Sequence, residues 1–109
     1  MEVRMVAQEF YLSPSLRDFL ERCLHTAFAH ARGQVARIVV RLRELNGLDG
    51  GKDKVCQVSV LMPGSPEVVI REVQEDMSQA IDGAVKRAAY RAMRMLNRKR
   101  LPRGRGPTS

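Results

Sequence analysis

The chain has 109 residues and a net charge of +7, a length that suits one domain with a modest core. No apolar run is long enough to span a bilayer. All 12 acidic residues lie within residues 1–82, whereas 9 of the 19 basic residues lie within residues 83–109. This asymmetry indicates an anionic partner, either nucleic acid or an anionic membrane. With two Tyr, three Phe and no Trp, phosphate contacts are favoured over base stacking.

The first part of the chain predicts a strand, a helix and a second strand. Polar and apolar residues alternate over residues 2–10, as in a half-buried strand. Ser13 followed by proline is a typical helix start, and apolar residues at helical spacing extend the helix to Arg32. Gly33 is well placed to end that helix in a left-handed conformation. Alternation resumes over residues 35–45 and predicts the next strand.

The middle of the chain predicts two more strands separated by turns. Residues 46–54 are rich in Asn, Gly and Asp and predict an exposed, mobile hairpin loop. Strands are predicted over residues 55–62 and 67–74, with a Pro- and Gly-containing turn between them. Residues 101–109 are rich in Pro, Gly and Arg and predict a disordered basic tail.

Residues 76–100 predict a long amphipathic helix. Its apolar residues recur at three- and four-residue spacing and cover one side. They are Met77, Ile81, Ala84, Val85, Ala88, Ala92, Met95 and Leu96. A different face carries four arginines within an arc of about 60°, namely Arg87, Arg91, Arg94 and Arg98. No acidic residue follows Asp82, so these arginines have no acidic partner further along the helix.

The order of elements predicts an α+β fold of two layers, β-α-β-β-β-α. Short turns favour antiparallel pairing of the last three strands, and two amphipathic helices can cover one face of a four-stranded sheet. The open face would display Arg37, Arg41 and Arg43. The predicted core comprises Leu16, Leu20, Leu24, Ile38, Val40, Val58, Val60, Ile81, Val85 and Ala88. Cys23 and Cys56 are predicted to be buried, reduced thiols.

Catalytic and metal chemistry lack support in the sequence. His25 and His30 fall on different sides of a helix, and the cysteines have no partner at ligand spacing. The sequence offers no set of a nucleophile, a general base and a third residue that orients the base. We therefore expect no catalytic residue, no metal, no cofactor and no small-molecule substrate. The absence of base-reading motifs predicts contact with the backbone and shape of structured RNA.

Two stretches carry a resemblance to a known family. The sequence DMSQAID opens the final helix, and RLRELNGLDGGKDKVCQVSV forms a strand, loop and strand in which an Asn-Gly turn leads to an Asp-Lys-x-Cys stretch. Together with the element order and the basic final helix, they resemble the ribosome hibernation promoting factors, including the ribosome-associated inhibitor A branch. The likeness covers residues 1–100.

This resemblance implies a fold related to double-stranded RNA-binding domains, in one ribosome-binding domain over residues 1–100. It implies a non-enzymatic translation inhibitor that binds ribosomal RNA of the small ribosomal subunit, in the channel for mRNA and tRNA. The family's RNA-facing positions correspond to Lys86, Arg87, Arg91, Arg94, Arg98, Arg37 and Arg41. We expect a cytoplasmic protein, monomeric away from the ribosome and not bound to membranes.

Two other hypotheses stay open on the sequence alone. One is an RNA-binding factor that assists ribosome assembly or maturation. The other is a protein that uses the same arginines to bind an anionic membrane or an acidic protein. The alanine-rich apolar face of the final helix weakens the membrane hypothesis, because the core needs that face.

Overall fold

The computed structural model describes residues 1–45 and 53–100, with side chains described through residue 98. Its elements are β1 (Glu2–Gln8), α1 (Pro14–Ala27), the 3-10 helix η1 (Arg32–Gln34), β2 (Arg37–Glu44), β3 (Lys54–Leu61), β4 (Val68–Gln74) and α2 (Met77–Arg100). The predicted α+β class and element order are confirmed. Residues 46–52 of the predicted hairpin loop and the predicted tail, residues 101–109, lie outside the described residues.

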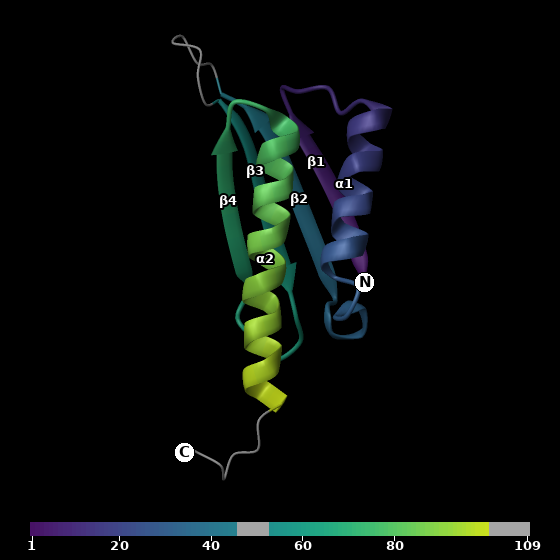
Figure 1. Ribbon diagram of the computed structural model, residues 1–109, viewed down its shortest axis with the longest axis vertical. Coiled ribbons are helices and arrows are strands. Elements are labelled where there is room, and N and C mark those ends of the chain that lie inside the picture. Colours follow the sequence, from purple (N-terminus) through teal and green to yellow (C-terminus); the bar gives the residue numbers. More distant parts are fainter. Residues whose placement is uncertain (46–52, 101–109) are drawn as a thin grey trace.

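The four strands form one sheet in the order β1-β2-β3-β4. The predicted antiparallel pairing of β2, β3 and β4 is confirmed, whereas β1 runs parallel to β2. A parallel pair needs a crossover connection, and α1 is that connection. Both helices lie on the same face of the sheet, with α1 toward β1 and α2 over β3 and β4 (Figure 1).

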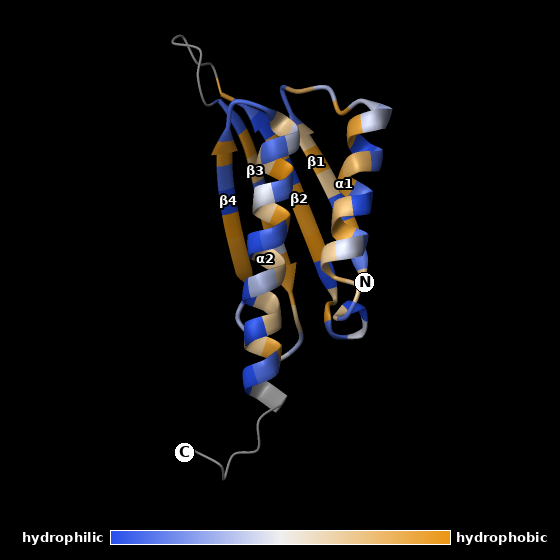
Figure 2. Ribbon diagram, in the orientation of Figure 1, coloured by the Kyte–Doolittle hydropathy of each residue, from blue (hydrophilic) through white to orange (hydrophobic). Residues whose placement is uncertain are grey.

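The core lies between the sheet and the helices. Ile38, Val40 and Val58 point from the central strands to the helices and are fully buried. The strands are largely hydrophobic along their middle, and both helices carry many hydrophilic positions (Figure 2). Every residue of the predicted core is buried except Leu16, which is half-buried. Leu16 lies in the first turn of α1 and packs at the edge of the core.

The end of α1 differs from its prediction. Ser13 caps the helix as predicted, because its hydroxyl accepts a hydrogen bond from the Leu16 N–H at 3.2 Å. The helix ends at Ala27, not at Arg32, and tighter turns and η1 follow. Gly33 lies inside η1 and does not adopt a left-handed conformation. Apolar residues every three or four positions suit 3-10 turns as well as an α-helix, so their spacing did not reveal the change.

Candidate nucleic-acid interface

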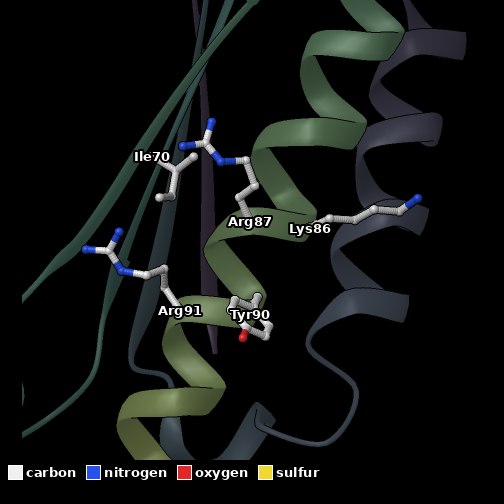
Figure 3. A pocket seen from close by; sticks show the side chains of 5 residues that line it. All are labelled: Ile70, Lys86, Arg87, Tyr90 and Arg91. Carbon is white, nitrogen blue, oxygen red and sulfur yellow. The ribbon is translucent and has the colours of Figure 1, made fainter.

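Four exposed arginines follow one side of α2, and we call them the arginine row: Arg87, Arg91, Arg94 and Arg98. From first to last they rise about 17 Å along the helix axis. Figure 3 shows Arg87 and Arg91 extending from α2 on the side of Ile70 in β4. Lys86 extends from the other side of α2, toward α1. The structure therefore separates Lys86 from the arginine row, although sequence reasoning grouped them.

Among the described basic side chains of α2, Lys86 and Arg87 have acidic partners. The Lys86 ammonium lies 3.1 Å from the Asp82 carboxylate, one helical turn earlier. Arg87 donates a 2.6 Å hydrogen bond from Nη1 to Oε1 of Glu72 at the end of β4. The sequence predicted no partner for the arginines along the helix, and this partner comes from the sheet. The Glu72 carboxylate holds Arg87 against the edge of the sheet and partly neutralises the positive charge of Arg87.

Glu72 reaches α2 because Gly83 leaves room for it. A Cβ atom at Gly83 would lie 3.1 Å from Cδ of Glu72 and 3.2 Å from its Cγ. The same carboxylate accepts a hydrogen bond of 2.8 Å from the Gln74 side chain. The space beside Gly83 therefore admits the Glu72 side chain, which in turn holds the first arginine of the row.

The remaining three arginines of the row have no ion pair among the described residues. The Arg94 guanidinium carbon lies 5.7 Å from the centre of the Tyr90 ring. A cation at this distance from an exposed ring gains about 0.5–1 kcal/mol. Three full positive charges thus remain available on one helix face, in a geometry that matches bidentate recognition of phosphate oxygens.

The open face of the sheet carries a second group of arginines. Arg37 and Arg41 are exposed on β2 and point away from the helices, because Ile38, Val40 and Leu42 point toward them. The structure therefore does not bring Arg37 and Arg41 together with the arginine row. These two lie on the opposite side of the sheet.

Arg43 also lies on this open face, as predicted, and strand pairing adds two more arginines. Arg4 on β1, Arg43 on β2 and Arg71 on β4 share the phase of Arg37 and Arg41, and we call the five the sheet arginines. Arg41 and Arg71 lie two strands apart in one cross-strand row, so their backbones are separated by about 10 Å. Sequence reasoning missed Arg4 and Arg71 as site residues, since only the pairing register shows that they join this group.

One acidic residue partly neutralises the sheet arginines. Glu2 lies 3.1 Å from the Arg37 Nε and 3.7 Å from an Arg4 guanidinium nitrogen. All three side chains are about half exposed, and ion pairs at such positions contribute little to stability. The positive potential of this face is therefore strongest around Arg41, Arg43 and Arg71.

The thiols lie apart from both basic surfaces. Burial raises the pKa of the Cys56 thiol to about 12, which keeps it protonated and unreactive at neutral pH. Cys23 is only half-buried, contrary to its prediction, because it lines a groove between α1 and α2 with Phe19 and Val85. Burial, followed by the nearby Asp82 carboxylate, also raises the pKa of Cys23. Neither thiol is a nucleophile in this state.

The described residues hold no candidate for a metal site or a membrane span. No group of three or more His, Cys, Asp or Glu side chains in residues 1–45 and 53–100 could hold a metal ion. Within the same residues, neither helix combines the length and the apolar character that crossing a membrane requires.

Comparison with known proteins places the chain in a family. Residues 3–100 match the family model described as sigma 54 modulation protein / S30EA ribosomal protein. A search of curated proteins returned no match. The fold is similar to that of a ribosomal subunit interface protein from Coxiella burnetii, with a TM-score of 0.74 and 21% identity over 89% of this chain and 99% of that one.

A second solved structure has the same fold. The N-terminal domain of Protein Y from Thermus thermophilus matches with a TM-score of 0.72 and 23% identity, over 87% of this chain and 99% of that domain. The family model spans nearly all of the described residues, and the resemblance inferred from the sequence is confirmed. The chain belongs to the sigma 54 modulation protein / S30EA ribosomal protein family.

Proposed function

We propose that this protein is a ribosome-associated translation inhibitor of the hibernation class. In this proposal it binds ribosomal RNA of the small subunit, in the channel that mRNA and tRNA otherwise occupy. The observation that carries the proposal is the arginine row, of which three members lack an acidic partner among the described residues. Membership of the S30EA family and the likeness to a ribosomal subunit interface protein support it.

The proposed mechanism is steric and electrostatic. Successive arginines of the row rise about 4.5–6 Å along α2, a step suited to contacts with neighbouring phosphates of one RNA strand. Each guanidinium can donate two parallel hydrogen bonds to phosphate oxygens, and each contact releases counterions from the RNA. A domain held in the channel in this way excludes mRNA and tRNA, and no covalent bond forms or breaks.

The two basic surfaces have different roles in this proposal. The arginine row contacts one RNA segment, and Arg41 on the open sheet face contacts a second segment on the other wall of the channel. Arg87 contributes less than Arg91, because a phosphate must compete with the Glu72 carboxylate for Arg87. Lys86 lies toward α1 and contacts RNA at the edge of the interface. The protein acts as a cytoplasmic monomer until it binds.

Cell-free translation tests the proposal. Wild-type protein should inhibit at amounts near one per ribosome, and the double variant Arg91→Glu/Arg94→Glu should not. Removal of two charge-assisted contacts should weaken ribosome binding by about 100-fold or more. The matched control is Arg17→Glu/Arg22→Glu on α1, which makes the same change in net charge at exposed positions and should inhibit like wild type.

Two results would reject the proposal. The first is a wild-type protein that fails to inhibit, and the second is a double variant that inhibits as well as wild type. Preferential binding to immature subunits without inhibition would instead support a role in ribosome assembly. Sedimentation of the purified protein with mature and immature small subunits separates these outcomes.

A further inference from the structure

Tyr90 is an exposed aromatic ring beside the arginine row, between Arg87 and Arg91 along α2. Its side chain is 63% exposed, whereas Phe28 is buried and Phe10 and Phe19 pack against the core. The other tyrosine, Tyr11, is exposed in the connection before α1, far from α2 in the sequence. A single exposed ring is ordinary on a protein surface, so the surroundings of Tyr90 decide whether it has a role.

Those surroundings contain both apolar and cationic groups. Tyr90 borders an open hollow of about 280 Å³ whose other sides are formed by Ile70 and by side chains of α2. Arg87 and Arg91 line the same hollow, and Figure 3 shows them on the side of Tyr90 that faces β4. This volume is smaller than the roughly 300–1,000 Å³ of typical small-molecule pockets, so the hollow suits one planar ring better than a larger ligand.

The arrangement offers a planar ring with cations around it. Arg91 lies on one side of Tyr90, and the Arg94 guanidinium carbon lies 5.7 Å from the ring centre. The Arg94 guanidinium lies over one face of the ring, so a base would stack on the other face and bring its own phosphate and the neighbouring phosphate within reach of these arginines. Proteins that bind single-stranded nucleic acid combine the same two features, a stacking ring and a positively charged path for the backbone.

We propose that Tyr90 stacks on an unpaired base of the bound RNA, so that the arginine row selects a single-stranded or looped segment over a duplex. This inference rests on the proposed RNA-binding function and adds a substrate class to it. In a duplex each base is covered on both faces by its neighbours, which leaves no face for Tyr90. A membrane surface offers anionic groups but no flat aromatic group that could stack on the ring.

An RNA containing 2-aminopurine tests the stacking directly. The probe is a single-stranded oligonucleotide of about 10 nucleotides, a length within the usual footprint of such sites, with 2-aminopurine at one position. Stacking on an aromatic ring quenches this base, and its fluorescence can be excited where tyrosine and ordinary bases do not absorb. Wild type should quench the probe on binding, and Tyr90→Phe should do the same because stacking needs the ring and not the hydroxyl.

Tyr90→Leu removes the ring and keeps an apolar side chain of similar reach. It should abolish the quenching and lower affinity for the single strand by about 5- to 150-fold. Affinity for a duplex of the same length should stay unchanged. Tyr11→Leu is the matched control at the other exposed tyrosine, and it should leave both the quenching and the affinities at wild-type values.

The possible failures are distinguishable. An equal decrease in affinity for single strand and duplex in Tyr90→Leu would mean that the ring only positions Arg94, and stacking would be overturned. Unchanged quenching and affinity in Tyr90→Leu would also overturn the stacking proposal. The Arg91→Glu/Arg94→Glu variant would still test the proposed RNA-binding function. If neither the tyrosine variant nor the arginine variant changes RNA binding, the proposed function itself fails.

Discussion

Glu72 has an influence on the candidate interface that its position in the sequence does not suggest. Its side chain points to the face of the sheet that the helices cover. Because it lies near the end of β4, its carboxylate reaches α2 beside Gly83. There it accepts hydrogen bonds from Arg87 and Gln74. One carboxylate thus links the last strand to the last helix and distinguishes Arg87 from the rest of the row. This link could not be predicted, since Glu72 and Arg87 are 15 residues apart.

Cys56 gives a prediction about alkaline stability. Burial raises the pKa of its thiol from 9.0 to about 12 in the folded protein. As the pH rises above about 9, the unfolded chain loses this proton while the folded protein keeps it, so the unfolded state is favoured. The stabilisation from the buried neutral thiol is therefore complete below pH 9 and is lost as the pH approaches 12. Wild type should lose about 1 kcal/mol from this group by pH 10.

The measurement is urea unfolding of wild type and Cys56→Ala at pH 7 and at pH 10. The Ala variant should be destabilised by about 1–3 kcal/mol at pH 7, and the difference from wild type should shrink at pH 10. Val58→Ala, on the same face of β3 and also fully buried, has no titratable group and should show the same penalty at both pH values. A penalty for Cys56→Ala that is independent of pH would contradict the assigned pKa.

At the scale of elements, α2 has two roles that its sequence keeps on separate faces. Small apolar residues such as Ala84 and Ala88 are fully buried and let the helix lie close to the sheet, while the arginine row stays exposed. Because the period of 3.6 residues determines both faces, α2 and its exposed arginines could be predicted from the sequence alone. The end of α1 could not, since Phe28 and Ala31 continue its apolar spacing into tighter turns.

Packing of α1 gives a matched pair of substitutions. Leu20 is fully buried between α1 and the sheet, whereas Leu16, one turn earlier, is half-buried at the edge of the core. Leu20→Ala should lower the free energy of unfolding by about 2–5 kcal/mol, because it removes apolar contacts and leaves a cavity. Leu16→Ala removes the same atoms from a site already partly in water and should cost less. Thermal and denaturant unfolding of the two variants measures both losses of stability. Equal losses would contradict the deeper burial of Leu20.

At the scale of the whole molecule, the two-layer fold places the arginine row and the sheet arginines on opposite sides. Alternation along β2 predicted Arg37 and Arg41 on an open face, and this was confirmed. The parallel pairing of β1 with β2 was not predicted from local patterns, because a strand's partner is set by the path of the chain through α1. The full set of sheet arginines therefore depends on topology as well as on sequence.

This separation predicts that the two basic surfaces contribute independently to ribosome binding. Charge reversal on the row, Arg91→Glu/Arg94→Glu, and on the sheet, Arg41→Glu/Arg43→Glu, should each weaken binding. In the fourfold variant the two decreases in binding free energy should add to within about 0.5 kcal/mol, since no hydrogen bond or ion pair among the described residues joins Arg91 or Arg94 to Arg41 or Arg43, and the two pairs lie on opposite sides of the sheet. Each pair should also reduce the slope of log affinity against log salt by about 1 for every phosphate that is no longer neutralised.

Ribosome binding of the four proteins over a range of salt concentrations provides the measurement, with Arg17→Glu/Arg22→Glu on α1 as the control of equal charge change. Independent contributions mean that RNA surrounds the domain on both faces, as expected of a protein held within a channel. Binding at a single flat RNA surface would engage one face only. In that case Arg41→Glu/Arg43→Glu would bind with the same affinity and salt slope as the α1 control. The proposed contact between the open sheet face and a second RNA segment would then be wrong.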